Sequence, residues 1–148
     1  MIPSRVVITS AVVALLLAVP ARADAPAGRY TTPQTGTVYD TKTKLTWQQV
    51  EDPQVETWAD ASTYCTSLSL AGGGWRLPAV KELFTLIDFK AVSTPLIDHI
   101  FSGTTADVFW SSTPEASPSS VYAWGVHFYF GLAGISDVGN TKRVRCVR

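Results

Sequence analysis

Several features that often reveal a function are scarce in this sequence of 148 residues. It contains only two histidines and two cysteines, and basic and acidic residues balance at 12 each. Without a basic excess we expect no nucleic-acid partner, because such binders carry a strong positive field. The sequence has no P-loop lysine after its glycines, no G-x-S-x-G elbow and no metal-ligand spacing of histidine and cysteine. We therefore predict no cofactor, no metal site and no catalytic residue.

Long apolar runs are confined to the beginning of the chain. A basic start up to Arg5 precedes an apolar stretch over 6–19, and Ala21 and Ala23 occupy the positions that a signal peptidase reads. We predict a signal peptide over 1–23 and an exported product, periplasmic or extracellular. Removing 23 of 148 residues leaves 125, with two fewer basic residues and a net charge of −2. That length is typical of one domain, and no later run could span a membrane.

The sequence after the predicted signal begins with a segment, 24–36, that is rich in proline, threonine, alanine and glycine. It lacks apolar periodicity, which predicts a flexible leader, so we place the domain at 37–148. Two β-rich runs at 37–40 and 45–48 flank the polar residues 41–44. This pattern is typical of a hairpin.

Two helices are predicted next. Thr57, with Asp60 three residues later, resembles a capping-box start. Apolar residues then recur at helical spacing before the triple glycine at 72–74: Trp58, Ala61, Cys65 and Leu68. The second helix follows Pro78, and its apolar stripe consists of Val80, Leu83, Phe84 and Ile87.

From Val108 onward the sequence is rich in aromatic and β-branched residues interrupted by turn signals. We predict three strand regions, at 108–111, 121–130 and 143–148. Loops are expected between them, at 113–120 and 131–141. A hairpin, two helices and then a series of strands indicate the α+β class.

Both cysteines fall on faces predicted to be buried. Cys65 lies on the apolar stripe of the first helix, and period-two geometry turns Val144 and Cys146 inward while Arg143 and Arg145 point the other way. In an exported protein the simplest expectation is one disulfide across most of the domain. The alternative is a catalytic or metal-binding thiol.

The sequence holds five tryptophans, and aromatic rings can stack on the apolar faces of sugars. Four lie in apolar patterns and are predicted to pack in the core: Trp47, Trp58, Trp75 and Trp110. The candidates for an exposed glycan-binding surface are Tyr122, Trp124 and Tyr129.

A basic cluster near the C-terminus is either a solvated strand face or a site for an anionic polymer such as a sulfated glycan. It consists of Lys142, Arg143, Arg145 and Arg148.

Arg76 lies directly after Trp75 and two residues before Pro78. An arginine packed on an aromatic ring and bridged to a carboxylate, here Glu82 or Asp88, would hold this loop to the second helix. We favour this structural role over a ligand contact.

Five ordered motifs carry a family resemblance. They are Thr37-Val38-Tyr39-Asp40 with Leu45-Thr46-Trp47-Gln48, Ala61 to Cys65, Gly73-Gly74-Trp75-Arg76-Leu77-Pro78 with Glu82-Leu83, Phe109-Trp110-Ser111-Ser112-Thr113, and Val144-Arg145-Cys146-Val147. Together they resemble the Lcl C-terminal domain family, which includes a domain of a collagen-like bacterial adhesin. The resemblance implies a C-type-lectin-like fold, similar also to the formylglycine-generating enzyme domain, with a helix cysteine paired to one in the last strand. It also implies a secreted or surface role and, for the adhesin, binding of sulfated glycosaminoglycans.

Two departures shape the functional expectation. The chain has no collagen-like repeat, and it lacks the Glu-Pro-Asn and Trp-Asn-Asp signatures of calcium-dependent sugar binding. We therefore expect an exported, non-enzymatic binding or adhesion module for an anionic or envelope glycan. The alternatives are an enzyme related to the formylglycine-generating group and a purely structural envelope module. The oligomeric state stays open.

Overall fold

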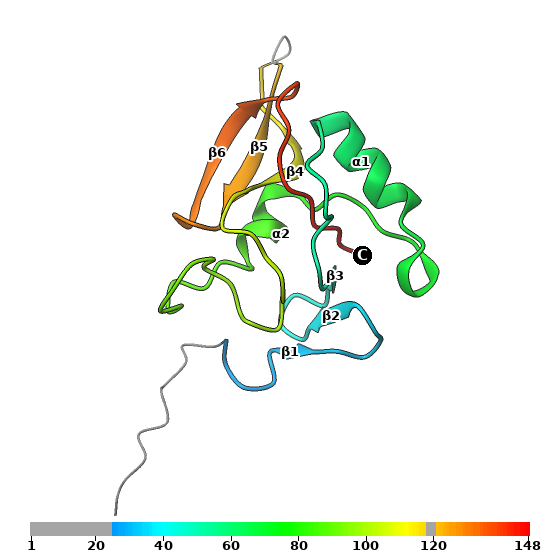
Figure 1. Cartoon of the computed structure of the whole chain (residues 1–148), viewed down its shortest axis with the longest axis vertical. Coiled ribbons are helices and arrows are strands. Elements are labelled where there is room, and N and C mark those ends of the chain that lie inside the picture. Colours follow the sequence, from blue (N-terminus) through cyan, green and yellow to red (C-terminus); the bar gives the residue numbers. More distant parts are fainter. Residues whose placement is uncertain (1–24, 118–120) are drawn as a thin grey trace, which may run out of the picture.

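The computed structural model describes residues 25–117 and 121–148, and the predicted signal peptide lies outside these residues. As predicted, the chain is α+β. Two antiparallel three-stranded sheets, with strand orders β1-β2-β3 and β4-β5-β6, are combined with two α-helices. Figure 1 shows helix α1 and the sheet β4–β6 on opposite sides of the C-terminal segment, with the sheet β1–β3 below them.

The first sheet contains the predicted hairpin. Strands β2 (Thr37–Asp40) and β3 (Thr46–Gln48) pair antiparallel, with Val38 opposite Trp47. Both of these side chains are fully buried. The predicted hairpin therefore forms and contributes both side chains to the core.

The segment expected to be a flexible leader, 24–36, instead contributes strand β1 (Tyr30–Thr31), which pairs with β2. Two side chains explain the difference. The Tyr30 ring packs edge-on against Phe101, with centroids 5.1 Å apart, and Arg29 Nη2 lies 3.1 Å from Asp40 Oδ2. Burial alone would raise the pKa of Asp40, but the Arg29 hydrogen bond helps to hold it below its usual range.

Both predicted helices form. Helix α1 (Trp58–Ser67) begins where expected, because Thr57 Oγ1 accepts a hydrogen bond from the backbone N–H of Asp60. It is followed by the 3-10 helix η1 (Leu70–Gly72). Helix α2 (Val80–Phe84) is only five residues long.

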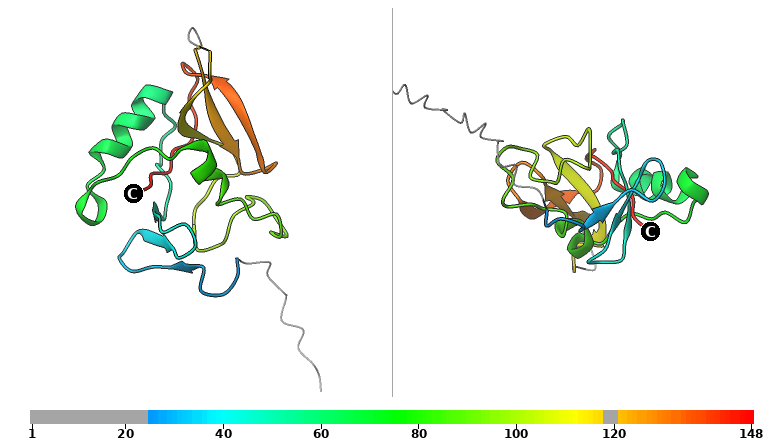
Figure 2. Two further views of the ribbon diagram at one scale, coloured as in Figure 1. Left: turned by 180° about the vertical axis from the view of Figure 1, so that it is seen from behind. Right: turned by 90° about the horizontal axis from the view of Figure 1, so that it is seen from below.

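The second sheet is a meander. Strands β4 (Val108–Pro114) and β5 (Tyr122–His127) match two predicted strand regions, although β5 ends earlier than expected. Strand β6 (Leu132–Asp137) lies within 131–141, which was predicted to be a loop. That prediction was wrong because all but one of the β6 residues are exposed, so the strand has no apolar alternation to reveal it. Figure 2 shows helix α2 lying against this sheet, which it contacts through β4 and β5.

The C-terminal segment, 143–148, joins the two sheets. Val147 forms antiparallel bridges to both Trp47 and Arg76, and Arg143 forms a parallel bridge to Phe109. The segment is therefore flanked on both sides rather than lying at the outer edge of a sheet (Figure 1). This arrangement decides the burial of its side chains.

Candidate functional site

An exposed aromatic surface lies where helix α2 meets β5 and β6. Tyr122 and Trp124 project from the same face of β5, since residues two apart in a strand share a face. Ile135 lies directly opposite Trp124 on β6. Tyr122 is 43% exposed and Ile135 is 47% exposed, whereas Trp124 is half-buried.

A groove of about 360 Å³ lies beside Trp124. Its lining consists of Val80, Lys81, Phe84, Trp124 and Ala133. Apart from the lysine these are apolar side chains, and α2, β5 and β6 all contribute to it. Among the ion pairs of residues 25–117 and 121–148, none involves Lys81. Within the part of the chain that the structure describes, the groove therefore combines apolar surface with one lysine that forms no ion pair.

Helix α2 is held in place by the residues just before it. Arg76 donates two hydrogen bonds of 2.7 Å to the Glu82 carboxylate, and this carboxylate also accepts from the N–H of Ala79 at 2.8 Å. The Arg76 hydrogen bonds lower the pKa of Glu82, against the opposing effect of burial. The N–H of Val80 donates to Thr113 Oγ1 on β4. The predicted bridge from Arg76 thus forms, with Glu82 as its partner.

A second group of rings surrounds the turn between β5 and β6. Tyr129, Phe130 and His127 contact one another, with the Tyr129 and Phe130 centroids 4.8 Å apart. The exposed Phe89 ring packs against the backbone of Gly131, where a Cβ would lie 2.7 Å from Cε1. The Phe84 and Phe89 centroids are 6.3 Å apart, so these rings connect the turn to the groove. We call Phe84, Phe89, Tyr122, Trp124, Tyr129 and Phe130 the aromatic surface.

Sequence reasoning found only part of this surface. Tyr122 and Tyr129 are exposed as predicted. Lys81, Phe89 and Phe130 were not singled out, and Phe84 was expected in the buried stripe but is 37% exposed. Leu83 and Ile87 of this stripe are buried in the core as expected, whereas Val80 and Phe84 line the groove.

The basic cluster near the C-terminus does not form an exposed face. Arg143 Nη1 lies 3.8 Å from Glu51 Oε1, and Lys142 is half-buried beside the backbone bridge that it forms with Glu56. Arg148 donates hydrogen bonds to the carbonyls of Ala71 and Gly73. Its guanidinium also lies 4.9 Å from the centre of the Trp75 ring. Most of this positive charge is therefore engaged within the fold.

Arg145 is the clearest departure from the sequence prediction, because its exposed fraction is 0%. Its guanidinium donates to Gln49 O at 3.0 Å and to Thr104 Oγ1 at 2.7 Å, and it lies 4.9 Å from the Phe101 ring centre. Burial lowers the pKa of Arg145 to about 10, partly opposed by Glu51. The expected outward face was wrong because the segment is flanked on both sides.

Residues 36–148 match the family model of the Lcl C-terminal domain. The chain belongs to the Lcl C-terminal domain family. Membership indicates a bacterial module of the surface or adhesion type. No curated protein matches the chain.

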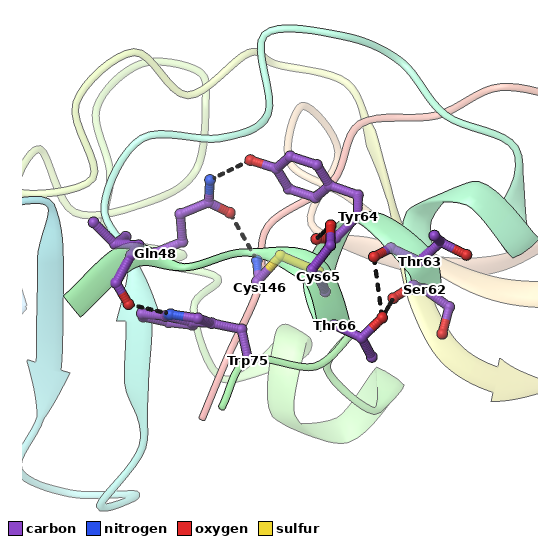
Figure 3. Close-up of a disulfide and its surroundings, with 10 residues drawn as sticks. Gln48, Ser62, Thr63, Tyr64, Cys65, Thr66, Trp75 and Cys146 are labelled. Carbon is purple, nitrogen blue, oxygen red and sulfur yellow. Dashed lines mark hydrogen bonds between the residues drawn. A yellow bond between two sulfur atoms is a disulfide. The ribbon is translucent and has the colours of Figure 1, made fainter. Parts of the chain in front are cut away.

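The motif residues of this Lcl C-terminal domain are structural in their contacts. Cys65 on α1 and Cys146 form the predicted disulfide, and the Gln48 side chain lies beside it (Figure 3). Gln48 donates to Tyr64 at 2.8 Å and accepts from the N–H of Cys146 at 3.1 Å. Trp75 is nearly buried and donates from Nε1 to a carbonyl of η1. These contacts connect helix α1 to the C-terminal segment.

Trp47, Trp58 and Trp110 were also predicted to be core residues. Trp47 and Trp110 are fully buried, as expected, and Trp110 Nε1 donates to Glu56 O. Trp58 is half-buried and donates to Ser111 O at 2.7 Å. Pro78 is buried directly before α2.

The described part of this Lcl C-terminal domain contains neither a grouped set of metal ligands nor a membrane-spanning helix. Within 25–117 and 121–148, no three histidine, cysteine, aspartate or glutamate side chains are grouped to hold a metal ion. In the same part of the chain, no helix combines the length and apolarity needed to cross a membrane.

Proposed function

We propose that this Lcl C-terminal domain is an exported, non-enzymatic binding module that holds a glycan on its aromatic surface. The observation that carries the proposal is the groove in which Trp124 and Phe84 lie beside Lys81. Aromatic rings pack against the C–H faces of sugars, and an ammonium group attracts sulfate or carboxylate substituents. An anionic glycan of the bacterial envelope or of a host surface fits both features.

Two observations support export and a non-enzymatic role. The first 23 residues have the pattern of a signal peptide, and disulfides persist mainly in oxidising compartments outside the cytosol. Both cysteines of the chain are joined in the disulfide. A cysteine-dependent reaction of the formylglycine-generating kind would require these same residues as free thiols.

The charge contribution is tested by retention of the purified protein on immobilised heparin, as a sulfated glycan. Lys81→Gln removes the positive charge beside the groove, and we expect about two- to five-fold weaker binding at low salt. An exposed ion pair contributes about 0.2–1 kcal/mol and is screened by added salt. Lys142→Gln is the matched control, because it removes the same charge from the C-terminal cluster. Equal losses from both variants, or no retention of the unmodified protein, would contradict this proposal.

The aromatic contribution needs a different variant. Phe84→Leu keeps an apolar side chain but removes the flat ring, and we expect weaker binding to neutral as well as sulfated oligosaccharides on a glycan array. Ring contacts contribute about 0.5–1.5 kcal/mol beyond area, or roughly two- to ten-fold. Val92→Leu changes an exposed residue of a different loop and serves as the control. Unchanged glycan binding by Phe84→Leu would remove the ring from the proposed site.

A further inference from the structure

Strand β6 is an open outer edge of the second sheet. The strand order β4-β5-β6 leaves one side of β6 without a neighbouring strand, and Figure 1 shows nothing beyond it. Within the described residues, the backbone of 132–136 forms no hydrogen bond to any segment except β5. Leu132 is 63% exposed and Ile135 is 47% exposed. The unpaired backbone groups of this edge are therefore accessible to another strand.

The edge also lacks the usual protection against pairing. Natural proteins cover such edges or place lysine, proline, charges or bulges in them. Residues 132–136, Leu-Ala-Gly-Ile-Ser, contain no charge and no proline, and all six pairs of β6 with β5 keep one uninterrupted register. The charged Asp137 comes only at the end of the strand. The sequence thus leaves an apolar edge ready to accept a strand.

We propose that a second copy of this chain pairs antiparallel with β6, with Gly134 opposite Gly134 of the other copy. In this register Ala133 faces Ile135 of the second copy, and Leu132 faces Ser136. The pairing is self-complementary, as a two-fold interface requires. Asp137 lies beyond the paired residues, so no carboxylates are placed opposite each other.

A second copy fits this edge better than a charged peptide. Residues 132–136 offer no charge that could select an acidic or basic partner, and without its predicted signal peptide the chain has a formal net charge of only −2. An ideal Cβ at Gly134 meets no atom within 4 Å, so the sheet face is uncovered at the centre of the proposed pairing. Two neutral, apolar and symmetric edges can therefore approach without strong repulsion.

The pairing has a consequence for the aromatic surface. A two-fold axis perpendicular to the sheet keeps the same face of both copies on one side. Ala133 lines the groove, and in the pair it lies beside Ile135 of the second copy. The dimer would then present two grooves on one continuous sheet. This bivalent display rests on the proposed function, whereas the dimer itself does not.

Sedimentation equilibrium of the disulfide-bonded protein, from about 1 μM to about 1 mM, covers the range expected for a small interface. The average mass should rise from one chain to two. Ala133→Lys combined with Ile135→Lys places lysine opposite lysine across the pair, and its mass should stay at one chain. Val55→Lys combined with Val92→Lys adds the same charge at exposed loop positions and should still dimerise. Circular dichroism checks that each variant is folded.

A charge swap tests the register. Mixing the double-lysine variant with Ala133→Glu combined with Ile135→Glu should restore a two-chain mass. Hydrogen exchange of the unmodified protein gives a readout without variants, since amides of 132–136 should exchange more slowly at high concentration. A single-chain mass throughout, or a dimer that the lysine pair leaves intact, overturns the proposal. Failure of the charge swap overturns the register. Heparin retention is measured separately, so its loss speaks only against the proposed function.

Discussion

The first prediction concerns Arg145. It distinguishes whether this side chain stabilises the fold or binds a glycan. Truncation by Arg145→Ala leaves Gln49 O and Thr104 Oγ1 without their donors and removes the cation beside Phe101. It also removes a buried positive charge that interacts electrostatically with the buried Glu51 carboxylate, whose ion-pair partner is Arg143 at 3.8 Å. Removing one partner of a buried charge arrangement costs about 3–5 kcal/mol. We expect the free energy of unfolding to fall by about that amount.

Urea unfolding followed by tryptophan fluorescence measures this loss, with the disulfide kept intact. Arg143→Ala is the matched control, because its side chain is 25% exposed and its distance to Glu51 is long. It should lower the free energy of unfolding by less than Arg145→Ala does, by about 1–3 kcal/mol, because the buried Glu51 carboxylate keeps its two hydrogen bonds from Thr105. Heparin retention is then measured on the folded fraction of both variants. If Arg145→Ala kept full stability but lost retention, Arg145 would be a ligand contact and our reasoning would be refuted.

Three further predictions test the fold. Cys65→Ala combined with Cys146→Ala removes a cross-link that spans 81 positions, and chain entropy predicts a loss of about 4–5 kcal/mol in urea unfolding. The lowered pKa of Glu82 stabilises the fold at pH values above the ordinary carboxyl pKa, and this stabilisation is lost as the pH falls through the folded-state pKa. Glu82→Gln removes this contribution, so the free energy of unfolding should depend less on pH in the acid range. Gly125→Ala places a Cβ 2.8 Å from a backbone oxygen of β4 and should cost about 1–3 kcal/mol, whereas Gly134→Ala meets no atom within 4 Å and should cost less than about 0.5.

The features that were predicted correctly depend on neighbouring residues. The N-cap at Thr57, the hairpin with Trp47 and the helix that carries Cys65 all arise from patterns within about ten residues. The disulfide also followed from sequence, because two separate local periodicities placed both cysteines inward. Local rules are sufficient when one face of an element is buried and the other is solvated.

The features that were missed depend on distant segments. Arg145 is buried against Gln49, just after β3, and against Phe101 and Thr104 in the segment before β4. Its hydrogen-bond partner Gln49 lies 96 positions away. Strand β1 forms because Arg29 and Tyr30 meet Asp40 and Phe101. None of these contacts alters the order of apolar and polar residues in the C-terminal segment or in β1. Period-two alternation therefore cannot predict them.

The burial of Arg145 also changes how a glycan would have to be held. Most of the C-terminal positive charge is engaged in the fold. The groove offers two rings and one lysine that has no ion-pair partner among the described residues. One exposed ion pair and one ring contact contribute about 1–2.5 kcal/mol together, which is weak for a single site. Linking two such sites can raise apparent affinity by about 10²–10⁴ without any new contact. Pairing through β6 would supply this link, so the affinity for a long glycan should rise over the protein concentrations at which the chain dimerises, whereas the affinity for a short oligosaccharide should stay constant.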